Sequence, residues 1–576
     1  MLATDRGLEF IESSSFDEEW REAIDQPDEI EEMLQRFVRA EAVGSVRYAE
    51  KLGGVRLLSV DRASGRLRWQ CEQGASLAGR VVEFRSMNVV YLVAVGRLSA
   101  ELCGEVPDTI FRVVRRRHRR AEARGRLFVR FDRASRFGAL GLRTVKDISM
   151  SGLSLQASRL DKLAGVEGTC EQVTLVSETE SARVDVRVRN ARLNPESGRW
   201  TIGMSLSAAS EDEWPVARRM IERTLYPTTD DSESDTWSVH EKSGYLELSG
   251  KNAAEFAHIR EDHLRSLRKI AAAPEVGHVL HWPREGTPQA TMSLFKLYQS
   301  TWFMCQLSKR RELSREQSKE SLRDLYVRGL ERQYTDPEGR WLLIYVQDAA
   351  PKFSSYVHIE LTKRFTRTGE GCLLPMHAFD VPVDARAHES RELGYMVRPA
   401  EGHAALWAMR ALCLVRPAQY LDAMDLNERR WDLAESGGRW HAAGMERERQ
   451  LLIAYQGNTS VALAVVELAE PGVHLYGLLD SLRMFPLRPG GERAFPALLA
   501  GARSWFAERG RAQFVYYREF EDGLSPAGER FRDLGGATLT LLALDRVPEI
   551  LERMTDFTAV RPQTHPRRDA RVAAPG

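Results

Sequence analysis

Cysteine is scarce and scattered in this 576-residue chain. Its six cysteines form no CxxC pair, which argues against a zinc ribbon, and the sequence predicts no metal site. Scattered reduced thiols are typical of a reducing compartment. The opening residues, MLATDRGLEF, lack the basic and apolar regions of a secretory signal. We therefore expect a cytoplasmic protein.

Long apolar runs and net charge are absent as well. No run approaches the roughly 18 apolar residues that span a bilayer, and Val89–Val95 has only the length of a strand. The 82 basic side chains are balanced by 82 acidic ones. This balance excludes a broadly basic nucleic-acid binder, which needs positive charge to displace counterions from phosphates. We expect no membrane span and no nucleic-acid partner, in a chain of about three or four domains.

The charges are nevertheless unevenly distributed along the chain. Residues 111–136 contain eleven arginines, opposed only by Glu122 and Asp132. Residues 226–240 begin with an acidic, Ser-rich stretch that has few apolar side chains to bury, which predicts an interdomain linker. Residues 558–576 are rich in proline and lack periodicity, so they are predicted to form a disordered tail.

The chain before this linker has a β pattern. After an N-terminal segment, residues 1–29, apolar side chains at helical spacing predict a short helix near residues 28–42. Short strand-like runs separated by turn residues follow and predict two successive β-barrels, residues 30–110 and 111–225. The expected strands are Val46–Tyr48, Val55–Val60, Arg66–Trp69, Val81–Phe84, Val89–Val95, Leu127–Phe131, Val184–Val188 and Trp200–Leu206.

Two motifs lie where the second barrel begins. Arg115, Arg116 and Arg120 have the spacing RRxxxR, and 27 residues after Arg120 the chain reads Asp147-Ile-Ser149-Met-Ser-Gly152, a DxSxxG. Arginine binds phosphate and the O6 and N7 atoms of guanine through two parallel hydrogen bonds, and its flat guanidinium stacks on purines. An aspartate can accept hydrogen bonds from the N1 and N2 edge of guanine.

These two motifs in this order resemble the PilZ family of cyclic di-GMP receptors, over about residues 111–225. The barrel before them resembles the N-terminal domain of flagellar-brake-type PilZ proteins. The resemblance implies cyclic di-GMP as ligand, with arginines contacting phosphate and guanine, and Asp147 and Ser149 recognising a guanine edge. Gly152 would let the backbone pass close to the ligand. Arg115 would favour an intercalated dimer of the nucleotide.

Other interpretations of the arginine cluster stay open. Arg119, Arg120 and Arg124 have the same RRxxxR spacing and form a second possible register. An arginine-rich run without such motifs is usually a solvated face or a nonspecific patch for anions.

The second half of the chain is predicted to be mixed α/β. Helical patterns cover about residues 253–273, 293–307, 315–333 and 495–509, and strands are expected at 341–347 and 356–361. RWLLIYVQ at residues 340–347 recurs as RQLLIAYQ at 449–456, which indicates a duplication with copies at 241–425 and 426–557.

The second copy resembles the GNAT acyltransferase fold. The expected order is three strands (450–455, 461–468 and 473–479), an Arg/Gly turn, a helix, the strand 513–517 and a closing segment FRDLGG at 531–536. The resemblance implies that Arg488, Gly490, Gly491 and Arg493 form the loop that holds the pyrophosphate of acetyl-CoA or another acyl-CoA. Arg493 stands where the family has Gly or Ala, Glu492 adds negative charge, and Pro489 removes one amide donor.

Candidates for acid–base chemistry in this copy are Glu467, Tyr516 and Tyr517. A tyrosine at that place can protonate a leaving thiolate. The alternative is that the tyrosines are core residues and that the glutamate is solvated.

The predicted fold is therefore two all-β barrels, a split-barrel-like N-terminal domain and a PilZ barrel, followed by a duplicated α/β GNAT-like module. The predicted function is a cyclic di-GMP receptor and effector that couples nucleotide binding at the PilZ barrel to the C-terminal GNAT-like module and has an unidentified protein partner. The alternatives are a cyclic di-GMP-regulated N-acyltransferase with an unidentified acyl acceptor and a scaffold that binds no nucleotide.

Overall fold

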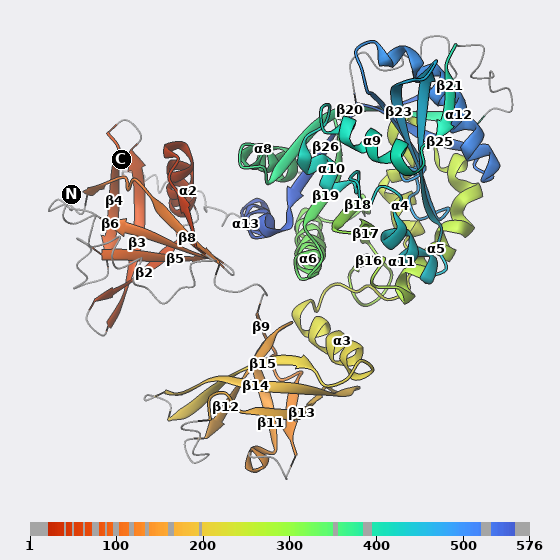
Figure 1. The fold of residues 1–576 in the computed structure, drawn as a ribbon. Coiled ribbons are helices and arrows are strands. Elements are labelled where there is room, and N and C mark those ends of the chain that lie inside the picture. Colours follow the sequence, from red (N-terminus) through yellow and green to blue (C-terminus); the bar gives the residue numbers. More distant parts are fainter. Residues whose placement is uncertain are drawn as a thin grey trace, which may run out of the picture. The chain divides into compact units, whose positions relative to one another are not determined.

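The structure, a computed structural model, describes residues 21–39, 42–48, 51–61, 64–71, 80–86, 89–95, 103–114, 120–132, 137–158, 166–194, 198–348, 355–383, 394–519 and 531–558. These residues form three β-sheets (Figure 1). Contacts group the chain into two compact units. The first comprises residues 1–230, 330–339 and 544–548, and the second comprises 231–329, 340–543 and 549–576. The predicted tail lies outside the described residues except for Thr558, as do the first 20 residues of the N-terminal segment.

The first sheet has eight strands in the order β1-β8-β6-β5-β2-β3-β4-β7. Their bounds are β1 (Arg21–Ile24), β2 (Val43–Tyr48), β3 (Lys51–Asp61), β4 (Arg66–Cys71), β5 (Arg80–Ser86), β6 (Val89–Val95), β7 (Cys103–Glu105) and β8 (Ile110–Val114). Helix α2 (Pro27–Arg39) buries Ile30, Leu34 and Phe37 in the core of this sheet. Phe37 stacks on Phe84 with ring centroids 4.2 Å apart. The predicted helix and the five strands predicted for this barrel are confirmed.

The second sheet closes into a barrel. Its order is β10-β13-β14-β15-β12-β11-β9, and β10 also pairs with β11, so six strands form a ring. The bounds are β9 (Ala121–Glu122), β10 (Phe128–Phe131), β11 (Leu142–Ser149), β12 (Gly152–Ser158), β13 (Cys170–Val176), β14 (Ser181–Asn194) and β15 (Arg199–Ala208), with a 3-10 turn η2 (Gly138–Leu140). Helix α3 (Glu213–Leu225) follows β15 and packs against β14 and β11 (Figure 1). The predicted barrel is confirmed.

The third sheet has eleven strands in the order β16-β17-β18-β19-β26-β20-β25-β24-β23-β22-β21. Their bounds are β16 (Gly277–Trp282), β17 (Ala290–Tyr298), β18 (Thr301–Lys309), β19 (Trp341–Gln347), β20 (Gly371–Pro382), β21 (Met396–Pro399), β22 (Arg447–Gln456), β23 (Thr459–Ala469), β24 (Ser481–Pro486), β25 (Gln513–Arg518) and β26 (Arg532–Ala543).

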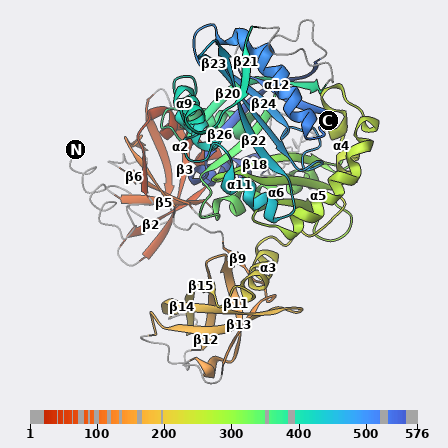
Figure 2. The same ribbon diagram turned by 45° about the vertical axis from the view of Figure 1, so that its right-hand side comes forward.

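This third sheet is built from two copies of one arrangement. In each copy three antiparallel strands are followed by a helix and then by a fourth strand that is parallel to the third. The first copy consists of β16, β17, β18, helix α6 (Arg315–Tyr334) and β19. The second copy consists of β22, β23, β24, helix α12 (Phe495–Glu508) and β25. The last strand of each copy is exchanged between the copies. β20 belongs to the first copy but pairs with β25 of the second. β26 belongs to the second copy but pairs with β19 of the first. β20 and β26 therefore lie in the middle of the sheet (Figure 2). The predicted duplicated α/β module is confirmed.

The remaining helices of this half precede, connect or follow these strands. They are α4 (Trp237–Ser243), η4 (Tyr245–Gly250), η5 (Ala253–Ile259), α5 (Arg260–Ala272), the π-helix η6 (Ser355–Ile359), α8 (Glu360–Phe365), α9 (Gly402–Leu412), α10 (Ala418–Ala423), α11 (Ala434–Ala442), η8 (Gly491–Ala494), η9 (Leu544–Arg546) and α13 (Val547–Thr558).

Several predictions for this half are wrong. Residues 293–307, predicted as a helix, belong to β17 and β18, and the predicted strand 356–361 lies in η6 and α8. All nine residues of β17 are buried, and a strand buried on both faces lacks the alternation that separates it from a helix. The predicted strand 473–479 is a series of turns with positive φ at Gly472 and Gly477, and the third strand of the copy is β24.

The sequence repeat also misidentifies the duplication. RWLLIYVQ forms β19, the fourth strand of its copy, whereas RQLLIAYQ lies in β22, the first strand of the other copy. The two segments are therefore not equivalent, and the boundary at residues 425 and 426 stays a prediction. In the predicted acidic linker, Thr229 and Thr236 are buried and α4 begins at Trp237.

Candidate functional sites

The DxSxxG motif forms the hairpin between β11 and β12. Asp147 lies near the end of β11, where its Oδ1 accepts a hydrogen bond from Nη1 of Arg120 at 3.1 Å. Its Oδ2 accepts one from the hydroxyl of Ser154 at 2.5 Å. The hydroxyl of Ser149 donates to the carbonyl of Gly152 at 3.0 Å, which ties the turn together. The structure thus brings Arg120, Asp147, Ser149 and Gly152 to one place.

The β ladder explains why Arg120 reaches Asp147. Strand β9 pairs with β11 so that Glu122 lies opposite Asp147. Arg120 precedes Glu122 by two residues, so it points to the same face of the sheet and sits diagonally from Asp147. The ion pair is only partly exposed, with 31% of the Arg120 side chain and 25% of the Asp147 side chain accessible.

Gly152 is required by packing at this hairpin. A Cβ atom at this position would lie 2.6 Å from the carbonyl oxygen of Met204, on the neighbouring strand β15. Ser154 is the residue of this cluster that sequence reasoning missed. Its place two residues after Gly152 on β12 is the signal that could have identified it, because that spacing puts its side chain on the same face as position 152.

The other predicted arginines are placed only in part. Arg115, Arg116 and Arg119 lie outside the described residues, between the end of β8 at Val114 and Arg120. Arg124 is exposed and lies with Gly125 in a tight turn, where its φ is 47°. Because Arg120 belongs to both RRxxxR registers, the choice between them stays open.

The predicted acyl-CoA loop lies between β24 and α12. Gly491 donates its amide to the carbonyl of Arg488 at 2.9 Å, and Arg493 donates its amide to Gly490 at 3.3 Å. These two amides are thus used inside the turn. A Cβ on Gly491 would lie 2.2 Å from the carbonyl oxygen of Val461, so the glycine lets η8 pack on β23. The side chains of Arg488 and Arg493 are exposed.

Glu467 is a buried partner of two arginines. Its carboxylate accepts hydrogen bonds from Arg447 Nη2 and Arg449 Nη2, each at 2.6 Å, and from the Tyr298 hydroxyl at 3.0 Å. Burial alone raises the pKa of Glu467, but the guanidinium groups of Arg449 and Arg447 outweigh it and lower the pKa to about 2. The carboxylate is therefore ionised at neutral pH, held between fixed positive charges.

Tyr516 and Tyr517 point to opposite faces of β25. Tyr516 is buried against Phe379 in an apolar cluster. The Tyr517 hydroxyl donates to the carbonyl of Leu478 at 3.0 Å, and the guanidinium of Arg483 lies 4.6 Å from its ring. Burial raises the pKa of Tyr517 well above its ordinary value.

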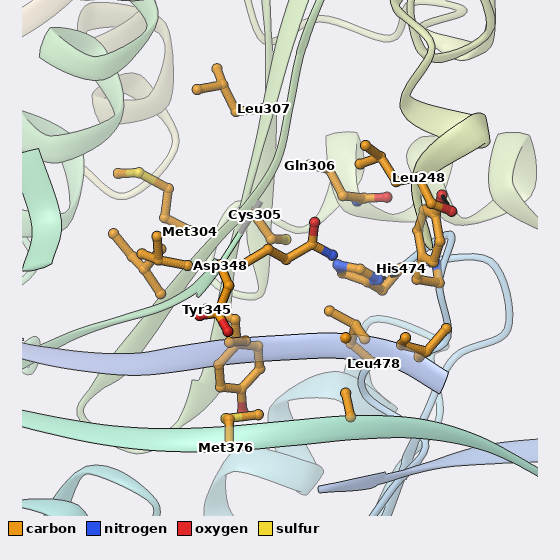
Figure 3. A pocket seen from close by; sticks show the side chains of 18 of the residues that line it. Leu248, Met304, Cys305, Gln306, Leu307, Tyr345, Asp348, Met376, His474 and Leu478 are labelled. Carbon is orange, nitrogen blue, oxygen red and sulfur yellow. Dashed lines mark hydrogen bonds between the residues drawn. The ribbon is translucent and has the colours of Figure 1, made fainter. Parts of the chain in front are cut away.

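A cavity of about 630 Å³ lies in the second unit, on the Tyr517 face of the sheet. Most of its lining is apolar, and the polar side chains Cys305, Gln306, Asp348 and His474 also line it (Figure 3). On the wall formed by α6 and η6, the Tyr326 hydroxyl and His358 Nε2 are 3.0 Å apart. Sequence reasoning missed this cavity, since its lining comes from many separate segments.

No group of three His, Cys, Asp or Glu side chains in the described part of the chain could hold a metal ion. None of the helices that the structure describes is both long and apolar enough to cross a membrane.

Comparison with known proteins rests on solved structures, because no protein-family model and no curated protein matches the chain. MrkH from K. pneumonia, in complex with c-di-GMP, is 17% identical, covers 36% of this chain and 94% of its own, and has a TM-score of 0.28. YcgR from Escherichia coli, in complex with c-di-GMP, is 14% identical over 37% of this chain and 94% of its own, with a TM-score of 0.29. A GCN5-related N-acetyltransferase from Kribbella flavida is 12% identical over 55% of this chain and 71% of its own, with a TM-score of 0.26. MrkH and YcgR therefore align with about a third of the chain and the N-acetyltransferase with about half, each with a TM-score below 0.5.

Proposed function

We propose that this protein is a cytoplasmic cyclic di-GMP receptor in which nucleotide binding at the second barrel changes the state of the GNAT-like module. The observation that carries the proposal is the cluster of Arg120, Asp147 and Ser154 beside the arginine-rich segment. A carboxylate acceptor and a guanidinium donor side by side match a ligand that carries guanines and phosphates.

Binding would exchange partners within this cluster. Asp147 is held by Ser154, so its free lone pairs keep a defined direction toward a guanine edge. The Arg120 guanidinium, now paired with Asp147, would instead contact a phosphate or the O6 and N7 atoms of guanine. Arg115 and Arg116 would add charge that compensates the two phosphates. The net exchange replaces a partly exposed ion pair, worth little by itself, with charge-assisted bonds to the nucleotide.

Contacts inside the first unit join helix α3, which follows the second barrel, to residues 330–339. This unit includes residues 330–339, which contain the last turns of α6. The Tyr226 hydroxyl, directly after α3, donates to Glu331 at 2.5 Å, and Arg332 donates to Glu222 of α3 at 3.2 Å. A nucleotide can shift this arrangement only as far as it binds one state more tightly than the other. The unidentified protein partner would recognise the module in one of these states.

Calorimetry with cyclic di-GMP and the full chain tests the receptor. We expect Asp147→Ala to weaken binding by roughly 5- to 150-fold, the equivalent of one paired base contact of about 1–3 kcal/mol. Asp185→Ala, which removes a carboxylate from β14 of the same barrel, is the matched control and should leave binding unchanged. Equal affinities for wild type and Asp147→Ala would contradict the proposal.

A second candidate function is N-acyl transfer from acetyl-CoA or another acyl-CoA. It is favoured by the parallel β24–β25 pair joined through α12, with the Arg488–Arg493 loop at the start of that helix. Tyr517 would then serve as the acid and Glu467 would hold the surrounding arginines. Acyl-CoA binding, measured by thermal shift with acetyl-CoA, would support the enzyme. No shift with either acetyl-CoA or cyclic di-GMP would support a scaffold.

A further inference from the structure

Helix α9 has one face that is buried against the third sheet (Figure 1). Ala405, Ala408, Met409 and Leu412 form this face, and they belong to the same apolar cluster as Leu451 of β22. Their spacing is that of an amphipathic helix with a single core-facing stripe. Packing on the sheet therefore accounts for the apolar residues of this face and for no others on α9.

A second apolar stripe on α9 lies outside this buried face. Ala404, Trp407, Ala411 and Leu414 follow one another at intervals of three, four and three residues, which is the spacing of a coiled-coil seam. Leu414 follows the end of the helix, and its amide donates to the carbonyl of Ala411 at 3.1 Å, so the last turn continues the stripe. Trp407 is 40% exposed and Leu414 is 86% exposed. Single exposed apolar side chains are common, but a continuous row of them marks a contact surface.

The sizes of these side chains favour packing of the stripe on a second copy of itself. Small and large side chains alternate along it, and positions 407 and 411 share one midpoint with positions 404 and 414. When two copies of the helix lie antiparallel, Trp407 of one copy therefore meets Ala411 of the other, and Leu414 meets Ala404. Each layer then holds one large and one small side chain, as knobs-into-holes packing requires. A parallel pair would place Trp407 on Trp407 and Ala404 on Ala404, which gives an overlap beside a gap.

The charges beside the stripe fit the same antiparallel arrangement. Arg410 donates to Glu428 through Nε at 2.6 Å, and both side chains are exposed. Arg410 adjoins the midpoint of the stripe, so the two Arg410–Glu428 pairs face each other across the twofold axis of such a dimer. Each copy brings one positive and one negative group, so the charges at the axis balance. The antiparallel order also places the positive end of each helix dipole beside the negative end of the other.

We propose that the stripe of Ala404, Trp407, Ala411 and Leu414 is the contact surface of a symmetric homodimer, formed by antiparallel packing of two α9 helices. Such an isologous contact closes on itself, so it produces dimers and not chains of molecules. One short helix from each copy buries less than the roughly 1,200–2,000 Å² of a stable interface, and the dimer therefore forms and dissociates with concentration. This inference concerns the second unit and does not depend on cyclic di-GMP binding.

Sedimentation equilibrium of the full-length protein, from about 1 to 300 µM, tests this proposal. We expect the wild type to pass from monomer to dimer within this range. Trp407→Ala leaves two alanines in each central layer and Ala411→Trp puts two tryptophans there, so each variant alone should associate at least about tenfold more weakly. Leu58→Ala, at a side chain on β3 that is 42% exposed, is the matched control and should leave association unchanged.

Mixing the two variants separates a lost contact from a lost fold. In the mixed dimer each alanine again faces a tryptophan, so an equimolar mixture should associate within about threefold of the wild-type affinity. Disulfide formation tests the direction of the helices, with the exposed Cys413 replaced by serine in every chain. Ala404→Cys mixed with Leu414→Cys should form a cross-linked heterodimer, and Ala404→Cys alone should not cross-link through position 404.

Three results would overturn the proposal. The first is a wild type that stays monomeric up to the highest concentration. The second is a mixture of the two folded variants that associates no more tightly than either variant alone. The third is a disulfide that joins position 404 of two Ala404→Cys chains, because it requires parallel helices.

Discussion

Replacement of Glu467 by glutamine tests the physical account of the buried charges in the third sheet. The change keeps the shape of the side chain but removes the charge that faces Arg447 and Arg449, whose side chains are completely buried. Removing one partner of a buried ion pair typically costs about 3–5 kcal/mol, because the remaining charge is left uncompensated. The pKa gives a similar figure: a fall from 4.5 to about 2 corresponds to about 3 kcal/mol of stability.

The pH dependence has a definite sign. Glu467 has a lower pKa in the folded protein than in the unfolded chain, so its contribution is complete above pH 4.5 and is lost as the pH falls toward about 2. Between pH 6 and 8 the wild type should therefore show no stability change that is due to this group.

Hydrogen exchange is the assay that isolates this effect, since a multidomain chain does not unfold in one step. Peptides from β22 and β23 should exchange about 150- to 5,000-fold faster in Glu467→Gln, the factor that corresponds to about 3–5 kcal/mol. Glu508→Gln is the control, because that carboxylate is 73% exposed. An increase of less than about tenfold would refute the reasoning. Lost acyl transfer with unchanged exchange would instead indicate a catalytic role.

The remaining predictions concern the nucleotide and the acyl-CoA loop. Arg116→Ala should weaken cyclic di-GMP binding in calorimetry and Arg124→Ala should not; the opposite result would select the second register. Arg115→Ala should reduce the stoichiometry from two nucleotides per chain to one, and an unchanged value would exclude its role in an intercalated dimer. Gly491→Ala should destabilise the β23–α12 region by about 1–3 kcal/mol, since its Cβ would meet the Val461 carbonyl. Unaltered thermal stability together with lost acetyl-CoA binding would show that the glycine serves a ligand.

Local patterns in the sequence were sufficient to predict the barrels. The helix that carries Ile30, Leu34 and Phe37 has a clear apolar period, and the barrel strands alternate between buried and exposed residues. The DxSxxG motif was informative because the residues proposed to face the ligand lie on one hairpin, close together in the sequence. The placement of Arg120 beside Asp147 depends on only one additional strand pairing.

Long-range pairing could not be predicted in the same way. The exchange of β20 and β26 brings together strands far apart in the sequence, and no local signal marks it. The strand β17 is buried along its whole length, so its apolar run was interpreted as part of a helix. The cavity combines Cys305, Tyr326 and His474 from three separate segments, and each of these residues alone has the pattern of a core side chain.

Calorimetry with two cyclic dinucleotides tests the central claim most directly. Cyclic di-GMP and cyclic di-AMP carry the same two phosphates, but adenine lacks the O6 acceptor and the N1 and N2 donors that the arginines and Asp147 would recognise. The account predicts that the full chain binds cyclic di-GMP and that cyclic di-AMP gives no measurable heat at the same concentration. Equal binding of both would show that the arginine segment binds anions without recognising the base. Absence of heat with cyclic di-GMP would contradict the account.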